Sequence, residues 1–458
     1  MNVNDTIAAI STPTGRGGVA LLRVSGDEAV TIAEKVFFPK SKTRLSEIPS
    51  NRAVYGDIMA DGQRIDDGIA VIYRAPHSFT GEDTVEVTCH GGILVTQEVL
   101  SALLSAGARP AEAGEFTRRA FVAGKLGLSA AEALGDLLEA KTHASLRLAR
   151  SGLDGKLERA TRSLYDRLLS LLSALYAAID YPEEDLAELS RGEAIARTRE
   201  ILADTRALGE TYRSGHAVAE GIATVICGRP NVGKSSLFNA LVGKDAAIVT
   251  SVAGTTRDVL EQTAAVGAVT LRLYDTAGLH ESEDTVERIG IERAREALDS
   301  AELVLAVFDR SAAASDEDLE LCAMLAEKTC VKFAILNKCD KDPVFDERLL
   351  GGFSAVISLS VKEERGLDAL KRAIEDAFFD GNLTLGEDAI VANARQHAAL
   401  VRTTEALLSA LGAFEGGLAE DICCSSLEEA MGALGGLDGR EVGEEIVSEI
   451  FSKFCVGK

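Results

Sequence analysis

The chain has 458 residues, of which 46% are hydrophobic, and it carries 72 acidic against 48 basic side chains. This length exceeds one ordinary hydrophobic core and predicts roughly two to four domains, and the hydrophobic fraction excludes wholesale disorder. The net charge of −24 argues against a protein that coats nucleic acid by itself, because such affinity comes mostly from cations that displace counterions from phosphates. It does not exclude a local basic patch or a basic partner.

Membrane and secretory features are missing from the sequence. The longest apolar runs, such as 168–179, are shorter than the roughly 18 to 20 residues that a membrane span requires. The N-terminus carries Asp5 where a signal peptide would carry lysine or arginine. None of the eight cysteines forms a C-x-x-C pair, which disfavours a zinc site or a disulfide framework. We therefore expect a soluble, cytoplasmic protein without membrane insertion.

Four stretches of the sequence differ in composition and in the spacing of their apolar residues. Residues 1–122 mix short apolar runs with glycine-rich turns, which predicts an α+β domain. Residues 123–218 carry leucines at helical spacing and predict long helices that break at Pro182. Residues 219–379 alternate apolar strands with amphipathic helices, which is typical of a parallel, doubly wound α/β domain. Residues 380–458 are predicted to be helical again.

The two helical stretches flank the α/β stretch. This order favours one helical domain interrupted by an inserted module, since domain termini often lie close together and tolerate insertions. Two independent helical domains are the alternative. We favour the insertion because the C-terminal stretch alone is short for a stable core.

A phosphate-binding loop is predicted at 228–235, where G-R-P-N-V-G-K-S follows the apolar run A-T-V-I-C and precedes a helical pattern. Glycines let successive backbone N–H groups face phosphates, and the helix N-terminus adds partial positive charge. We expect Lys234 to reach the β- and γ-phosphates and Ser235 to offer its hydroxyl to Mg²⁺. A flexible glycine loop without a ligand is the alternative, which the strand–loop–helix setting disfavours.

Two further motifs follow in GTPase order. D-T-A-G at 275–278 comes after an apolar strand, so Asp275 is expected in the Mg²⁺ shell and the Gly278 N–H at the γ-phosphate. N-K-C-D at 337–340 ends another strand, and the carboxylate of Asp340 matches the two adjacent donors on the edge of guanine. Asn337 is expected to brace this loop, with Lys338 along the base.

The remaining motifs complete the set. S-V-K at 360–362 has the position of a second base-contacting loop. G-T-T-R-D at 254–258 is the candidate switch loop, in which Thr256 would complete the magnesium shell; a simple polar turn is the alternative. Together the motifs predict a Ras-like P-loop G domain that binds and hydrolyses GTP.

Leu279 follows D-T-A-G and cannot orient an attacking water as the glutamine of Ras-like enzymes does. The form G-x-P-N-x-G-K-S, with G-T-T-R-D and D-T-A-G-L, resembles the MnmE (TrmE) family of tRNA-modifying GTPases. Other stretches are similar to that family in the same order: the N-terminal run 5–26, S-F-T-G-E-D at 78–83, A-G-E-F-T-R-R-A-F at 113–121 and the terminal F-C-V-G-K. The resemblance spans essentially the whole chain.

The resemblance implies a catalytic arrangement that the motifs alone do not. In the family, G domains dimerise across their switch faces and K⁺ occupies the place of an arginine finger. Carried over, Asn231, Thr250, Val252 and Thr255 would hold K⁺, and Glu287 would orient the attacking water. An ordinary exposed helix glutamate is the alternative for Glu287.

The resemblance also implies a folate-binding N-terminal domain that forms a constitutive homodimer. Its folate contacts correspond to Arg23, Glu82, Lys125 and Lys458, where cations suit the glutamate tail of folate and a carboxylate suits the pterin donors. Without the resemblance, each of these would be a surface charge. Cys455 has two interpretations, a reactive catalytic thiol near that pocket or a free cysteine packed near the C-terminus.

The full set of expected nucleotide-binding residues is Asn231, Val232, Gly233, Lys234, Ser235, Ser236, Thr250, Ser251, Val252, Ala253, Gly254, Thr255, Thr256, Asp275, Thr276, Ala277, Gly278, Asn337, Lys338, Asp340, Ser360, Val361 and Lys362.

The leading hypothesis is a K⁺-dependent GTPase that works with the flavoprotein MnmG in a heterotetramer or larger complex. It would install a 5-carboxymethylaminomethyl-type group on the wobble uridine of certain tRNAs, with 5-formyl- or 5,10-methylene-tetrahydrofolate as the source of one carbon. A regulatory GTPase of ribosome assembly, like Era or Der, is the alternative. The acidic segment 411–458 suits docking to a more basic partner, or is solvated helix surface.

Overall fold

The computed structural model describes residues 5–13, 15–180, 189–243, 261–274, 298–439, 444–452 and 454–457. The chain divides into two compact units, one of residues 1–135 with 435–458 and the other of residues 136–434. Within the described ranges, no helix is long and apolar enough to cross a membrane.

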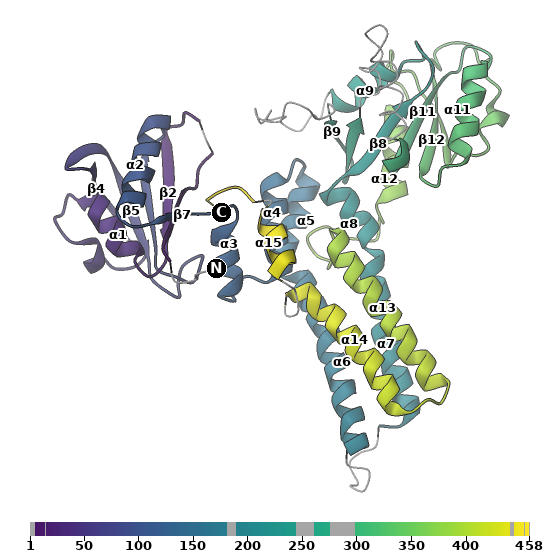
Figure 1. The fold of residues 1–458 in the computed structure, drawn as a ribbon. Helices are drawn as coiled ribbons and strands as arrows, with labels where there is room; N and C mark the ends of the chain where they lie inside the picture. The colour runs from purple at the N-terminus through teal and green to yellow at the C-terminus, as the bar shows by residue number, and fades with distance from the viewer. Residues whose placement is uncertain are drawn as a thin grey trace. The chain divides into compact units, whose positions relative to one another are not determined.

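The first unit contains a seven-stranded sheet (Figure 1) with the strand order β3-β4-β5-β6-β2-β1-β7. Its strands are β1 (Ile7–Ile10), β2 (Val19–Ser25), β3 (Phe37–Pro39), β4 (Ala53–Ala60), β5 (Gln63–Tyr73), β6 (Thr84–His90) and β7 (Arg109–Pro110). All neighbours pair antiparallel except β1 and β7, which are parallel. The predicted α+β domain is confirmed.

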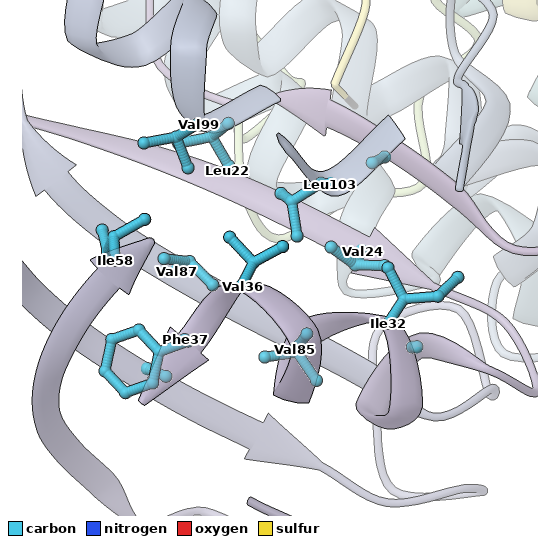
Figure 2. Close-up of a cluster of buried hydrophobic side chains, with 14 of the residues drawn as sticks. Leu22, Val24, Ile32, Val36, Phe37, Ile58, Val85, Val87, Val99 and Leu103 are labelled. Atoms are coloured by element: carbon cyan, nitrogen blue, oxygen red, sulfur yellow. The ribbon is translucent and has the colours of Figure 1, made fainter. Parts of the chain in front are cut away.

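Helices α1 (Ala29–Val36) and α2 (Ile93–Ser105) pack against this sheet. Successive strand side chains point to opposite faces, so Leu22 and Val24 of β2 lie on the same face as Val85 and Val87 of β6. Figure 2 shows these side chains packed with those of both helices, and all four are fully buried. This core holds the sheet and the loops at its ends in place.

The C-terminal segment packs within the first unit. Its helix α15 (Glu444–Ser452) contacts α3 (Glu115–Val122), and Phe451 and Phe454 share a core with Ala131 of α4 (Leu128–Glu139). A side chain at Gly457, whose φ is +98°, would lie 2.2 Å from the carbonyl oxygen of Ile10. Contacts therefore group the residues from 435 onward with the N-terminal residues, although the sequence pattern alone assigns them to the helical stretch 380–458.

The second unit contains a six-stranded sheet with the order β13-β12-β11-β8-β10-β9. Its strands are β8 (Ile222–Cys227), β9 (Glu261–Val266), β10 (Val269–Tyr274), β11 (Leu303–Asp309), β12 (Val331–Asn337) and β13 (Ala355–Ser358). Five strands are parallel, as predicted, and only the edge strand β9 runs antiparallel to its neighbour. β9 and β10 are joined by a tight turn, which permits the antiparallel pairing.

Helices cover both faces of this sheet. Residues 303, 305 and 307 of β11 pack into one core with α9 (Lys234–Val242) and α12 (Leu367–Phe378), while residues 304, 306 and 308 pack into a second core with α11 (Asp316–Ala326). Every residue of β11 is buried, as expected for a central parallel strand. The doubly wound α/β architecture is confirmed.

The helical part of the second unit combines segments from before and after the α/β sheet. Its helices are α5 (His143–Leu153), α6 (Lys156–Asp180), α7 (Arg191–Glu210), α8 (Tyr212–Ala219), α13 (Ala394–Glu415) and α14 (Glu420–Asp438). α7 packs along α13, and Figure 1 shows α6, α7, α13 and α14 side by side. The α/β module is therefore inserted into one helical bundle, which confirms the favoured prediction. Pro182, the predicted helix break, lies outside the described residues.

Candidate functional site

The loop 228–233 connects the end of β8 to the start of α9 and depends on two glycines. A Cβ at Gly228, whose φ is +145°, would lie 2.3 Å from the carbonyl oxygen of Val307. A Cβ at Gly233, whose φ is +107°, would lie 2.2 Å from the Nδ2 atom of Asn337. Both positions combine a left-handed backbone with close neighbours, so only glycine fits.

The N-terminus of α9 lies at the end of this loop. The first backbone N–H groups of a helix have no intrahelical acceptor, and Gly233 has no side chain that could cap them. Lys234 places its Nζ atom 2.9 Å from the carbonyl oxygen of Gly228 and 3.0 Å from that of Arg229. Partial burial lowers the pKa of Lys234. The loop therefore surrounds one ammonium group and a helix N-terminus, an arrangement that suits a phosphate chain.

Asn337 joins three loops at the same edge of the sheet. Its Nδ2 atom donates to the carbonyl oxygen of Val232 at 2.8 Å, and its Oδ1 atom accepts from the N–H of Val361 at 3.2 Å. The side chain is buried. Because β8, β12 and β13 are parallel, their carboxyl ends lie at one edge, and Asn337 ties the phosphate loop to both following loops there.

Lys338 is positioned by a carboxylate that the sequence motifs did not identify. Its Nζ atom donates to the Oδ2 atom of Asp309 at 2.6 Å and to the carbonyl oxygen of Asn231 at 3.1 Å. The Oδ1 atom of Asp309 accepts from both the N–H and the hydroxyl of Ser311. Burial alone would raise the pKa of Asp309, but the hydrogen bonds from Lys338 and Ser311 outweigh it and lower the pKa to about 2. The only sequence signal was an aspartate at the end of the apolar run L-V-L-A-V-F.

Asp340 lies in the loop after β12 with its carboxylate exposed to solvent. A hydrogen bond from Ser360 lowers the pKa of Asp340, so the group is a carboxylate at neutral pH. The N–H of Cys339 donates to the carbonyl oxygen of Leu359 at 3.1 Å, which joins the N-K-C-D and S-V-K loops. Ser360 is buried in this junction, with Val361 and Lys362 following it. The structure thus brings together the predicted residues of 231–236, 337–340 and 360–362.

Several predicted residues lie outside the described part of the chain. They are Thr250, Ser251, Val252, Ala253, Gly254, Thr255, Thr256, Asp275, Thr276, Ala277, Gly278, Glu287 and Lys458.

The N-terminal candidates gather around the loop 76–83 of the first unit. Arg23 forms an ion pair with Glu86 at 2.7 Å, and its guanidinium lies 5.6 Å from the ring centres of both Phe79 and Phe116. Glu82 accepts from the hydroxyl of Ser25 at 2.8 Å. The Nζ atom of Lys125 donates to the carbonyl oxygen of Pro76 at 2.7 Å. Three of the four predicted folate contacts are therefore neighbours of one loop.

Arg119 is the central residue of a buried ionic network beside this loop, and the sequence reasoning missed it. Its side chain is 7% exposed and contacts the carboxylates of Asp5, Glu82 and Glu115. Arg109 pairs with Asp5 and Glu115 as well. Burial would raise the pKa of Glu115, but the hydrogen bonds from Arg109 and Arg119 lower it. The network links α3 to the segment before β1, to β7 and to the loop that carries Glu82.

Cys455 is exposed to solvent, and both of its neighbours contact other residues of the first unit. Its neighbour Phe454 belongs to the core with Phe451, and Val456 forms an antiparallel bridge with Ala113. The backbone on both sides of the thiol is therefore held in place.

Comparison with known proteins agrees with this architecture. The family model "GTP-binding protein TrmE N-terminus" matches residues 6–125, and the model "MnmE helical domain" matches residues 128–455. The tRNA modification GTPase MnmE of Listeria welshimeri is 42% identical over 99% of both chains, and that of Thermoanaerobacter pseudethanolicus is 40% identical over 100% of both.

Solved structures match parts of the chain. Era in complex with MgGDPNP and a segment of 16S ribosomal RNA is 25% identical over 40% of this chain and 65% of its own, with a TM-score of 0.28. The G domain of the Thermotoga maritima FeoB iron transporter is 27% identical over 33% of this chain and 96% of its own, with a TM-score of 0.26. From its end-to-end similarity to the curated relatives and from the match of both family models, we conclude that the chain belongs to the MnmE family of tRNA modification GTPases.

Proposed function

We propose that the chain binds and hydrolyses GTP at the carboxyl edge of the six-stranded sheet, as one step in the modification of tRNA. The observation that carries this proposal is the position of Asn337, whose side chain joins the phosphate loop to the loop after β13. Through this contact, groups suited to phosphates and groups suited to guanine lie at one site. The name of the curated relatives supports tRNA as the substrate of the modification.

Each group at this edge has a defined task. The Lys234 ammonium and the N-terminus of α9 stabilise negative charge on the phosphate chain, and they need no reorganisation because the loop already holds them. The Asp340 carboxylate accepts two hydrogen bonds from guanine, whereas adenine would leave it unpaired. Lys338, held by Asp309, lies beside the phosphate loop where it can cover the base.

Metal ions fit the described end of the phosphate loop. The exposed hydroxyl of Ser235 is an oxygen ligand of the kind that Mg²⁺ prefers, and the exposed side chain of Asn231 offers an amide oxygen for K⁺. With them we propose Asp275 and Thr256 near Mg²⁺, and Thr250, Val252 and Thr255 around K⁺. Such cations neutralise charge that develops between the β- and γ-phosphates. Glu287 is proposed to orient the attacking water.

The N-terminal loop fits a folate. The three described candidate side chains keep hydrogen-bonding capacity for a ligand. The NH1 group of Arg23 has no hydrogen bond to the described residues, and the Lys125 ammonium donates one of its three protons. A carboxylate such as that of Glu82 can accept up to about four hydrogen bonds. These residues, with Lys458, would hold the tail and the pterin ring. When bound, the folate supplies one carbon to the tRNA modification; Cys455 is proposed as a thiol at this site.

The proposed assembly is a cytoplasmic homodimer in complex with the flavoprotein MnmG, and its product is a carboxymethylaminomethyl-type wobble uridine. From the sequence we propose a folate-binding domain (1–122), a helical domain (123–218 and 380–458) and a G domain (219–379), although by contacts the residues from 435 onward belong to the first compact unit. The regulatory, Era-like alternative is not favoured, because the curated relatives match this chain from end to end.

Nucleoside mass spectrometry of tRNA from a deletion strain tests the proposed reaction. We expect the modified wobble uridine to disappear and to return when the gene is supplied on a plasmid. Unchanged wobble uridines would contradict the role in tRNA modification. In a separate assay, the rate of GTP hydrolysis is expected to rise steeply when K⁺ replaces Na⁺. Equal rates in both salts would contradict the proposed role of Asn231 as a K⁺ ligand.

A further inference from the structure

An open groove of about 720 Å³ lies along α6 and α7 of the helical bundle, and none of its lining residues belongs to the nucleotide-binding edge. Four arginines line it, Arg159, Arg162 and Arg167 from α6 and Arg197 from α7, against the carboxylates of Asp166 and Glu200. Among the lining residues, arginines thus outnumber carboxylates by four to two, and one of them, Arg167, is paired with Asp204 outside the lining. This local excess is opposite in sign to the net charge of −24 of the whole chain.

Packing of the bundle does not require these arginines. On α6, the groove residues 159, 162, 163, 166, 167 and 170 recur at spacings of three and four, so they form one face of the helix. A separate stripe that includes Leu164, Leu168 and Leu171 is buried in the bundle. Alanine or glutamate at the groove positions would leave that buried stripe intact, so the basic character of the groove needs another explanation.

Two of the four guanidinium groups form no hydrogen bond or ion pair within the described part of the chain. Arg167 is paired with Asp204 at 2.5 Å, and Arg159 donates to the carbonyl oxygen of Asp154. Arg162 and Arg197 are exposed, and neither has a hydrogen bond or an ion pair to a described residue. The groove therefore offers one guanidinium group from each helix that has no hydrogen bond or ion pair to a described residue, although Arg197 is close enough to Glu193 to interact electrostatically with that carboxylate. A third, Arg159, donates to an uncharged carbonyl.

We propose that this groove binds the phosphate backbone of the RNA substrate, an inference that rests on the proposed role in tRNA modification. Guanidinium groups bind phosphate oxygens in pairs, and the hydroxyls of Ser163 and Ser170 in the same lining can donate to further phosphate oxygens. The described lining contains no aromatic side chain on which a base could stack. The groove would therefore position the RNA without reading its sequence.

RNA is favoured over an acidic protein segment as the ligand. The proposed reaction brings a polyanion to a chain whose overall charge repels it, so the RNA must be held where cations are locally in excess. The proposed reaction does not require an acidic protein segment to bind at this groove. The two ligands predict different results for RNA affinity, which makes the choice testable.

The test compares the full-length wild-type chain with the double variant R162E/R197E. Binding of fluorescently labelled tRNA is measured by anisotropy at several KCl concentrations between about 50 and 200 mM. We expect the variant to bind tRNA at least about tenfold more weakly at low salt, and the slope of log K against log salt to fall by about 2, one for each lost phosphate contact. The conservative variant R162K/R197K should keep most of the affinity.

A matched control separates the groove from general charge effects. The variant R147E/R206E makes the same change in charge at two exposed arginines of α5 and α7 outside the groove. We expect its tRNA affinity to stay within about twofold of wild type. Melting temperatures and GTP hydrolysis without tRNA should be equal in all variants, because none of these positions lies at the nucleotide-binding edge.

The outcomes distinguish the inference from the proposed function. Wild-type tRNA affinity in R162E/R197E would overturn the groove as an RNA site and leave an acidic protein as its ligand. An equal loss in R147E/R206E would overturn it too, as a general effect of charge. A wild-type chain that shows no tRNA binding at low salt would instead contradict the proposed function.

Discussion

Asp309 holds Lys338 beside the phosphate loop, and its replacement by asparagine tests this positioning role. Asparagine keeps an oxygen that can accept the hydrogen bonds from Ser311. It removes the negative charge of the carboxylate, whose Oδ2 atom accepts a hydrogen bond from the Lys338 Nζ atom at 2.6 Å. The pKa of Asp309 is lowered from 3.8 to about 2. At about 1.4 kcal/mol per unit, this shift corresponds to a stabilisation of about 2 kcal/mol, and little screening applies because the side chain is only 12% exposed.

The sign of the pH dependence follows from the lowered pKa. The stabilisation by Asp309 is complete above the unfolded value of 3.8 and is lost as the pH falls through about 2. At neutral pH, D309N should therefore lower the free energy of unfolding by up to about 2 kcal/mol in urea titrations. The Lys338 side chain is then held only by the carbonyl of Asn231.

The assay is binding of a fluorescent GDP analogue, followed by steady-state GTP hydrolysis. We expect D309N to weaken nucleotide binding about tenfold and to raise KM with little change in kcat, because the proposed contact of Lys338 with the base would be equal in the ground and transition states. S311A is the matched control, since it keeps the ion pair and loses one hydrogen bond worth about 1 kcal/mol. Wild-type nucleotide affinity in D309N would refute the positioning role.

Three further predictions concern single residues. G233A should abolish nucleotide binding in the same fluorescence assay, because its Cβ would lie 2.2 Å from the Nδ2 atom of Asn337; retained binding would show that the loop can rearrange. D340N should shift nucleotide preference from guanine to xanthine, and retained GTP affinity would contradict the assignment of the base reader. For H216Q, the pH dependence of the melting temperature is informative. The pKa of His216 is raised above 6.5 by its hydrogen bond to Glu302, so its stabilisation is complete below 6.5 and is lost as the pH rises through the folded value. The melting temperature of H216Q should therefore lie furthest below wild type near pH 6 and approach it toward pH 9, and a gap that widens with pH would contradict the ion pair.

The parts of the fold that local patterns determine were predictable. The apolar strands of residues 219–379 predicted a parallel, doubly wound domain, and β11 divides its residues between two cores. The glycines at 228 and 233 were expected for close approach of a phosphate. The structure adds that protein atoms, Val307 O and Asn337 Nδ2, already exclude any larger residue at both positions.

The parts that depend on distant contacts were not predictable from motifs. Arg119 pairs with Asp5, 114 residues away, and the hydroxyl of Ser11 donates to the carbonyl of Gly457, 446 residues away. Neither contact follows from helical or strand periodicity, because periodicity describes only neighbours within one element. The same limit explains why Asp309 was missed, since its partner Lys338 belongs to the adjacent strand end rather than to its own segment.

The acidity of the chain and the arginine groove of α6 and α7 have complementary physical roles. At physiological ionic strength, charges more than about 8 Å apart are largely screened. Although the net charge of the chain is −24, a bound RNA is therefore repelled mainly by the acidic groups close to the surface that it contacts. Acidic surfaces such as the first turns of α11 and α14 would make most orientations of a bound RNA unfavourable. Orientations that place phosphates along Arg159, Arg162 and Arg197 would keep their attraction. The excess of acid thus need not oppose RNA binding, because it restricts where on the surface an RNA can be held.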